Sequence, residues 1–292
     1  RGRPTETTKG HSIGIDVPAH AEFVIEGHVA PKERRIEGPF GDHFGHYSTA
    51  AMFPVFHVSA ITTRTNPVFA ATVVGKPPME DKWLGDVNQL ILGPLARLIH
   101  PEVRDVWAFY EAGFHNLLGV ACEQRYAKEA MKTALSLATD GQLSLTKCAI
   151  MVNSGVNNRD FRALIRAIRD NFDPHYDFLL IPNVAMDTLD FTSYTMNLGS
   201  KMLIDATAKM GETASGGKYP PREASSFYAR TGLRPERPES MDLRIRDSRV
   251  IEEALLVVQI DSSIEATHRA GKTESAGSTG RALMEKLIAD EN

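Results

Sequence analysis

The sequence has few of the features that would decide its class at once. Only two of its 292 residues are cysteines, Cys122 and Cys148, and each lies inside a hydrophobic run. A disulfide framework is therefore excluded, and we expect buried thiols in a reducing compartment, the cytoplasm. The longest apolar stretches, such as residues 254–258, are far shorter than the roughly 20 residues that cross a bilayer, so no membrane span is predicted.

An excess of positive charge and the common phosphate-binding motifs are also missing. The chain has 33 Lys and Arg against 37 Asp and Glu, a formal net charge of −4, so no nucleic-acid partner is expected. The sequence contains no G-x-x-x-x-G-K-[ST] motif, no G-x-G-x-x-G motif after a predicted strand and no G-x-S-x-G motif. The kinase and serine-hydrolase classes therefore lose support.

The start of the sequence is unusual, because the chain begins with Arg1 rather than Met. The segment Arg1–Glu6 lacks the apolar core of a signal peptide, and we expect it to continue from an earlier part of a longer chain. The length alone is sufficient for one large domain or two smaller domains with their own cores.

Residues 1–80 have the composition of antiparallel β structure. Three segments are rich in β-branched and aromatic side chains, namely residues 23–25, 55–61 and 68–74. Turn formers such as Asn66-Pro67 separate them. Large apolar residues then recur at helical spacing between Trp83 and Leu98, which predicts a linker helix over residues 81–100.

Residues 101–210 alternate between strand and helix patterns. The predicted strands are residues 117–122, 145–152 and 178–181, and the predicted helices are residues 127–138 and 160–172. Two consecutive β-α-β units with apolar strands indicate a mainly parallel sheet covered by helices on both faces. This part is therefore predicted to be a three-layer α/β domain.

The remainder is less regular. Residues 211–249 contain many Gly and Pro residues, which favours an extended surface linker. Residues 218–249 carry eight Lys or Arg and five Asp or Glu, so an acidic partner for the linker stays open. Residues 250–292 are predicted to be a helical segment, with helices at 250–264 and 282–288 that dock on a neighbouring subunit.

The densest polar cluster runs from Glu37 to Tyr47. Its carboxylates, Glu37 and Asp42, are separated by Gly-Pro-x-Gly, where the backbone must bend and can bring both side chains to one pocket. Converging carboxylates separate their pKa values, which suits general acid-base catalysis. The alternative is structural: Asp42 caps a turn and Glu37 is solvated.

The same cluster has a second chemical interpretation. Asp42, His43 and His46 are carboxylate and imidazole groups of the kind that bind a divalent metal. A metal-dependent hydrolase built on these three residues therefore remains a candidate.

Four blocks of the sequence resemble the signature blocks of the UbiD family of decarboxylases. They are Phe23–Gly27, Ile36–Tyr47, Val74–Asp81 and Asn197–Thr207. The resemblance is collinear from about Arg1 to Thr207. It implies the C-terminal part of a split β-barrel flavin-binding domain, a linker helix and a three-layer α/β domain.

The activity implied by the resemblance is reversible, non-oxidative decarboxylation of an aromatic or α,β-unsaturated carboxylic acid. In the family, prenylated flavin mononucleotide (prenylated FMN) forms an adduct with the substrate, and CO2 leaves or enters. A flavin prenyltransferase supplies the cofactor, and family members assemble as dimers or hexamers. We therefore expect a homo-oligomeric, cytoplasmic carboxy-lyase.

The resemblance also implies roles for individual residues. Glu37 matches the family glutamate that pairs with a catalytic arginine, and Asp42 matches the proton donor, where Asp stands in place of Glu in many members. Four softer matches are Val74 and Leu84 on the flavin side and Met186 and Leu189 on the substrate side. For these four, ordinary core packing is an equal alternative.

Several family elements have no counterpart in these 292 residues. The flavin-phosphate site, the catalytic arginine and the ligands for Mn²⁺ or Mg²⁺ and K⁺ precede the equivalent of Arg1, so the metal ligands are expected outside this chain. Asn153-Ser154-Gly155 stands where many members have an acidic run. A second functional hypothesis is therefore a non-catalytic UbiD-like subunit of a multi-subunit aromatic carboxylase, similar to those of phenylphosphate carboxylase.

Overall fold

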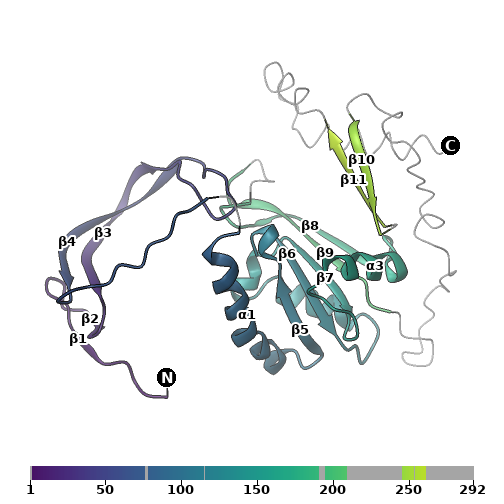
Figure 1. Ribbon diagram of the computed structural model, residues 1–292, viewed down its shortest axis with the longest axis horizontal. Helices are drawn as coiled ribbons and strands as arrows, with labels where there is room; N and C mark the ends of the chain where they lie inside the picture. Colours follow the sequence, from purple (N-terminus) through teal and green to yellow (C-terminus); the bar gives the residue numbers. More distant parts are fainter. Residues whose placement is uncertain are drawn as a thin grey trace. The chain divides into compact units, whose positions relative to one another are not determined.

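The structure is a computed structural model, and its chain divides into two compact units, residues 1–84 and 85–292. It describes residues 2–75, 78–114, 116–190, 195–208, 245–252 and 254–260. The first unit is a β ribbon, and the second contains a sheet with helices (Figure 1).

The first unit is dominated by one long antiparallel ribbon. Strand β3 (Phe23–Glu37) pairs with β4 (Ala51–Thr63), from Phe23 opposite Thr63 to Glu37 opposite Ala51. The register shifts after Glu26, at Gly27, where a side-chain Cβ would lie only 2.0 Å from the His57 carbonyl oxygen. Glycine is therefore required at this bulge. Two short antiparallel strands, β1 (Thr7–Lys9) and β2 (Asp16–Pro18), complete the unit.

The predicted strands at residues 23–25 and 55–61 are confirmed, but the one at 68–74 is wrong. Residues 68–74 form no strand, and Val68, Phe69 and Val73 are 73%, 76% and 89% exposed. Strand propensity reflects packing on a pleated, half-buried surface. Without a neighbouring strand in the described residues, this apolar segment stays irregular.

A buried carboxylate organises the turn between β1 and β2. Glu26, in β3, is 2% exposed and accepts the backbone N–H groups of His11 (2.6 Å), Ser12 (2.7 Å) and Ile13 (3.1 Å). The Ser12 hydroxyl donates to the same carboxylate. These backbone hydrogen bonds, led by the one from Ser12, lower the pKa of Glu26 to about 2.

The second unit is built on a mixed sheet with strand order β5-β6-β7-β9-β8. Its strands are β5 (Val103–Ala108), β6 (Leu117–Cys122), β7 (Cys148–Asn153), β8 (Phe178–Ala185) and β9 (Leu198–Asp205). The central pairings β6·β7 and β7·β9 are parallel, whereas the edge pairings β5·β6 and β8·β9 are antiparallel. The predicted mainly parallel sheet is therefore only partly right.

The helices of the second unit agree with the sequence pattern. They are α2 (Glu129–Leu137) and α3 (Phe161–Asn171), with short 3₁₀ turns at Tyr110–Ala112 and Gly141–Leu145. The β6-α2-β7 unit forms as expected. The second predicted β-α-β unit does not, because β9 lies between β7 and β8, which leaves β8 antiparallel at the edge.

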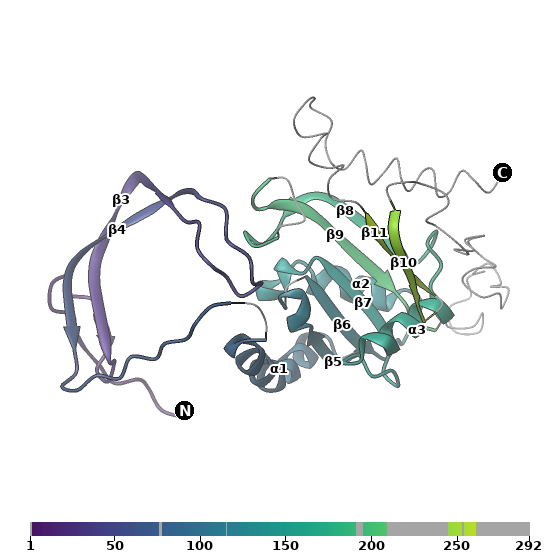
Figure 2. The same ribbon diagram turned by 45° about the horizontal axis from the view of Figure 1, so that its top comes forward.

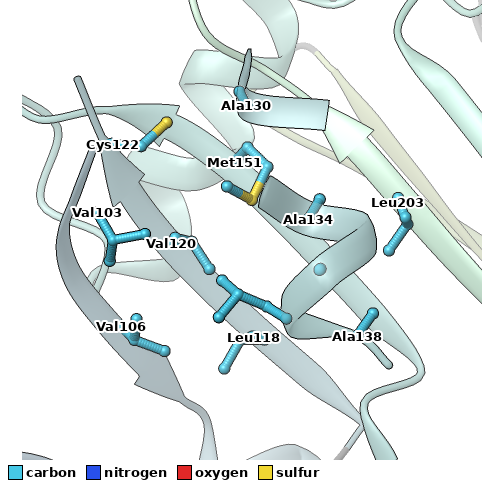
Figure 3. Close-up of a cluster of buried hydrophobic side chains, with 12 residues drawn as sticks. Val103, Val106, Leu118, Val120, Cys122, Ala130, Ala134, Ala138, Met151 and Leu203 are labelled. Atoms are coloured by element: carbon cyan, nitrogen blue, oxygen red, sulfur yellow. The ribbon is translucent and has the colours of Figure 1, made fainter. Parts of the chain in front are cut away.

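Alternate residues of the central strands form two cores. Leu118, Val120 and Met151 face α2, together with Leu203 of β9 (Figure 3). The intervening residues, such as Ile150 and Val152, pack with Leu164 of α3. Helices α2 and α3 therefore cover opposite faces of the sheet, which Figure 2 shows from a second side. This alternation follows from the period of two along a strand.

The helix that precedes the sheet, α1 (Glu80–Ile99), matches the predicted linker helix. None of its residues is buried. Its small residue Ala96 packs against the core on the α2 side, whereas large residues such as Ile91 and Leu98 are 64% and 80% exposed. No helix in the described ranges has the length and hydrophobicity needed to cross a membrane.

The predicted helix at residues 250–264 is wrong where the structure describes it. Strands β10 (Ile245–Ile251) and β11 (Leu255–Ile260) form an antiparallel hairpin instead. Glu252, at the turn of this hairpin, has a φ of 51°. Its carboxylate forms ion pairs with Arg162 and Arg166 of α3, with N···O distances of 2.9 and 3.4 Å. Residues 245–249, which were predicted to be part of the linker, belong to β10 instead. Residues 211–244, 261–264 and 282–288 lie outside the described residues.

Both cysteines are free thiols on central strands of the sheet. Cys122 is buried, as expected, and Cys148 is partly buried. Burial raises the pKa of each thiol to about 12.

Replacing Glu26 with Gln tests the buried carboxylate. Its pKa of about 2 lies below the ordinary value of 4.5, so its contribution to stability is complete above pH 4.5 and is lost as the pH falls towards 2. We expect E26Q to unfold at a lower temperature than the wild type at pH 7, with the difference shrinking below pH 4.5. Amide hydrogen exchange of His11–Ile13 should rise in E26Q, and equal exchange would contradict the assignment.

Leu118 and Leu98 form a matched pair for the core, because Leu118 is fully buried and Leu98 is 80% exposed. We expect L118A to lower the free energy of unfolding by about 2–5 kcal/mol because it leaves a cavity. L98A should change it by less than about 1 kcal/mol. Denaturant unfolding measures both, and similar losses in the two variants would contradict the assigned core.

Candidate functional site

The polar cluster forms the loop between β3 and β4. Glu37 is the last residue of β3, pairs with Ala51 and is exposed. The chain leaves the strand directly afterwards, where Gly38 has a φ of 86° and the Gly38–Pro39 peptide is cis. Gly38 thus adopts a conformation that side chains disfavour. The bend predicted from Gly-Pro-x-Gly is present.

Beyond this bend, residues 40–48 form a small hairpin. The N–H of Ser48 donates to the Phe40 carbonyl (2.8 Å), and the Phe40 N–H donates to the Ser48 hydroxyl (3.2 Å). At its tip, the Asp42 N–H donates to the His46 carbonyl (3.0 Å), and the Gly45 N–H donates to the Asp42 carbonyl (2.9 Å). These bonds fix Asp42 at the first corner of a tight turn.

The Asp42 carboxylate lies against its neighbour His43. Oδ1 of Asp42 accepts the His43 backbone N–H at 2.7 Å and lies 2.9 Å from His43 Nδ1. The two side chains are 20% and 26% exposed. The His43 ring packs on Phe44, with 4.5 Å between ring centroids. Asp42 is therefore partly buried and reachable, as a proton donor must be.

Val74, one of the four site residues that match the family less specifically, lies beside this loop. A Cβ on Gly41 would lie 3.8 Å from Val74 Cγ1, an ordinary contact. Leu84 belongs to α1 and is 60% exposed. Its flavin role stays a prediction.

Met186 and Leu189 follow β8 in the second unit. Met186 is 4% exposed and lies against β9, where a Cβ on Gly199 would be 2.8 Å from Met186 Cγ. Buried Asp190 fixes the end of this segment through an ion pair with Lys147 (2.7 Å). The segment is thus well anchored, and its role in substrate binding stays a prediction.

The metal hypothesis gains no geometric support. Within the described ranges, no group of three or more His, Cys, Asp or Glu side chains is arranged to hold a metal ion. Asp42, His43 and His46 therefore form no such centre, and His43 instead contacts Asp42 directly.

Sequence reasoning missed two further groups of buried polar residues. Glu102 and Glu129 are 2% and 0% exposed, and both form ion pairs with Arg125. Desolvation is the largest single effect on both carboxyls and opposes their ionisation, but several hydrogen bonds and charges together outweigh it and lower the pKa of each. The Thr133 hydroxyl leads these interactions at Glu102, and the side chain and backbone N–H of Arg125 provide them at Glu129. Charge pairs distant in sequence leave no periodic signal, so no pattern could have revealed the link to Glu102.

Buried Lys201 forms the second group. It is 5% exposed and donates to the carbonyls of Ser144 and Thr146. Burial lowers the pKa of Lys201. Its only sequence signal is its place within the Asn197–Thr207 block.

Two domain families match the sequence. The "3-octaprenyl-4-hydroxybenzoate carboxy-lyase Rift-related domain" matches residues 1–77, and the "3-octaprenyl-4-hydroxybenzoate carboxy-lyase C-terminal domain" matches residues 82–206. The first matched range ends just before α1, and the second begins within its first turn. Both describe parts of UbiD.

Similar proteins are about twice as long as the matched region. A protein of Archaeoglobus fulgidus is 44% identical over 70% of this chain and 42% of its own length, and one of Aquifex aeolicus is 38% identical over 75% and 45%. The chain therefore spans less than half the length of these curated relatives.

Solved structures have a similar fold. Vanillic acid decarboxylase of Sedimentibacter hydroxybenzoicus, in its closed form, is 29% identical with a TM-score of 0.66, over 75% of this chain and 45% of that one. The UbiD-class enzyme HmfF of Pelotomaculum thermopropionicum, in complex with FMN, is 27% identical with a TM-score of 0.58, over 75% and 49%.

Gly38 and Gly41 provide a matched test of the loop. Alanine at position 38 would hold a left-handed conformation, with its Cβ 3.2 Å from the Ser48 hydroxyl, whereas alanine at position 41 meets only Val74 at 3.8 Å. We expect G38A to lose about 1–2 kcal/mol of stability and G41A to change by less than about 1 kcal/mol. Thermal unfolding and the amide shifts of residues 40–48 measure the effect. A G38A loop identical to wild type would contradict this geometry.

Proposed function

The chain belongs to the UbiD family of carboxy-lyases, and we propose that it forms part of an enzyme that removes or adds CO2 at an aromatic or α,β-unsaturated carboxylic acid. The observation that carries the proposal is the Asp42 loop. It holds a partly buried carboxylate at the tip of a fixed turn, and the neighbouring Gly41 lies close to an apolar residue, Val74. A general acid requires this combination of fixed position and access.

The loop suits a planar, largely apolar cofactor. Gly41 has no side chain where it approaches Val74, and Phe40 and Val74 are 48% and 45% exposed. The similar UbiD-class enzyme HmfF has been solved in complex with FMN. We assign Val74 and Leu84 to the ring of a flavin cofactor, which we take to be prenylated FMN. When bound, this cofactor supplies the electron sink for the carbon that loses CO2.

The chain itself contributes proton transfer and orientation. In the decarboxylation direction, Asp42 gives a proton to the substrate carbon from which CO2 has left, and in the carboxylation direction it removes that proton. Glu37 is assigned as the electrostatic partner of an arginine on another segment, and its exposure at the end of β3 suits that role. Met186 and Leu189 are assigned to the apolar part of the substrate.

The exposed surface of β3 and β4 supports the proposal that they belong to a split β-barrel. Seven large apolar residues on the two strands are 47–75% exposed, namely Ile25, Val29, Ile36, Met52, Phe56, Val58 and Ile61. An isolated two-stranded ribbon is marginally stable in water, so we infer that further strands pair with it. The proposed domains remain residues 1–80 for the flavin-binding domain, 81–100 for the linker helix and 101–210 for the α/β domain. The boundary proposed between residues 249 and 250 is moved to Ile245, where β10 begins.

Further parts of the proposal rest on the family. Ligands for Mn²⁺ or Mg²⁺ and for K⁺ would come from outside this chain, as would the flavin-phosphate site. A homo-oligomer, a flavin prenyltransferase as supplier of the cofactor and a cytoplasmic location are inferred in the same way. The alternative is a non-catalytic subunit of an aromatic carboxylase, and the presence of both Glu37 and Asp42 favours the enzyme.

The Asp42→Asn variant tests the proposed proton donor. The assay uses the full-length holoenzyme that contains these residues, loaded with prenylated FMN. We expect D42N to reduce turnover by about 10²–10⁴-fold because asparagine has no proton of suitable acidity. CO2 release from a panel of aromatic acids and deuterium incorporation from heavy water measure the change.

Asp16→Asn is the matched control, because Asp16 is an exposed carboxylate paired with Lys9 on β1. We expect D16N to retain wild-type turnover. Full activity of D42N in an active holoenzyme would reject the catalytic role and favour the non-catalytic subunit.

A further inference from the structure

Two nitrogen atoms of His43 converge on one oxygen of the Asp42 carboxylate. Oδ1 lies 2.7 Å from the backbone nitrogen of His43 and 2.9 Å from its ring nitrogen Nδ1. We propose that His43 is a positioning residue: its two N–H groups occupy Oδ1, so that the acid proton of Asp42 is carried and delivered by Oδ2. This inference rests on the proposed role of Asp42 as proton donor.

The assignment of the proton follows from the lone pairs. A carboxylate oxygen offers two lone-pair sites, and both sites of Oδ1 are taken when the backbone N–H and the Nδ1–H of His43 donate to it. A neutral carboxylic acid has a single O–H group. In this arrangement the O–H group must lie on Oδ2, and Oδ1 remains the carbonyl oxygen.

The proton-transfer step then balances at named atoms. The electron pair that remains on the substrate carbon after CO2 leaves forms the new C–H bond with the proton of Oδ2. The electron pair of the O–H bond stays on Asp42, which becomes a carboxylate. The negative charge is shared with Oδ1, where the two His43 N–H groups already point, so the charge is stabilised without reorganisation. Water returns the proton to Oδ2.

The surroundings keep the His43 ring in place. Its side chain is 26% exposed and packs on Phe44 at 4.5 Å with an angle of 32° between the ring planes. Gly45, with a φ of 79°, closes the turn through its N–H bond to the Asp42 carbonyl. His46 accepts the Asp42 backbone N–H through its carbonyl. The contact therefore depends on the whole turn.

The proposal requires a hydrogen on Nδ1 of His43, and NMR can observe it without cofactor or activity. Long-range ¹H–¹⁵N spectra of histidine-labelled protein are recorded at a pH of about 8.5, roughly two units above the ordinary histidine pKa near 6.5. We expect the Nδ1–H tautomer at His43 in the wild type and a shift of its ¹⁵N signals in D42N. A neutral ring with its hydrogen on Nε2 would overturn the proposal.

Two substitutions separate hydrogen bonding from packing. The amide of asparagine places an N–H near the position of Nδ1, whereas leucine fills space without a donor. In the full-length holoenzyme we expect H43L to lower kcat by about 10- to 100-fold, the loss typical of one hydrogen bond to a charged group, while KM changes by less than about threefold. H43N should recover most of kcat. Equal losses in H43L and H43N, or wild-type kcat and deuterium incorporation in H43L, would overturn the proposal.

The control is His20→Leu, since His20 is 66% exposed and paired with Glu6 on the surface. H20L should retain wild-type kcat and KM. The activity of D42N distinguishes the two hypotheses. If D42N is fully active, the proposed function is wrong, whatever the tautomer of His43. If D42N is inactive and H43L has normal activity, only the proposed role of His43 is wrong.

Discussion

The backbone hydrogen bonds between β3 and β4 hold the first unit together, and the candidate site depends on them. The pairing of Glu37 with Ala51 ends the ladder and brings the two ends of the loop side by side. The intervening residues must then reverse direction, and Gly38 makes this possible with its positive φ. Glu26, in the same strand, ties the preceding turn to the ribbon through three backbone N–H groups. A change of register would move both features.

The second unit follows a different constraint, which is burial of its central strands on both faces. Leu118 and Met151 contact one helix layer, and Ile150 contacts the other. Apolar side chains are therefore required at consecutive positions, and strands β6 and β7 read as continuous apolar runs. This is why the sequence predicted them well. The edge strand β5 carries the charged residues Arg104 and Asp105. It is therefore not a continuous apolar run, and the sequence pattern did not predict it.

The order of the strands could not be read from the sequence. Periodicity predicts that β7, α3 and β8 follow one another, but it does not show that β9 enters the sheet between β7 and β8. The apolar run after Val250 illustrates a second limit, since a short apolar segment fits a strand as well as a helix. There the turn at Glu252, with its φ of 51°, divides the run into two strands. In the candidate site, Gly-Pro-x-Gly predicted the bend, but the contact between Asp42 and His43 depends on turn angles that no residue pattern specifies.

The depth of the two thiols has a practical consequence for experiments on this chain. With a pKa of about 12 for Cys122 and Cys148, only roughly one thiol in 10⁵ is ionised at neutral pH, and the thiolate is the reactive form. Thiol-directed alkylating reagents should therefore leave both cysteines of the folded protein unmodified. A single cysteine introduced on the surface would be a selective attachment point for a fluorophore or spin label, with both native cysteines left in place.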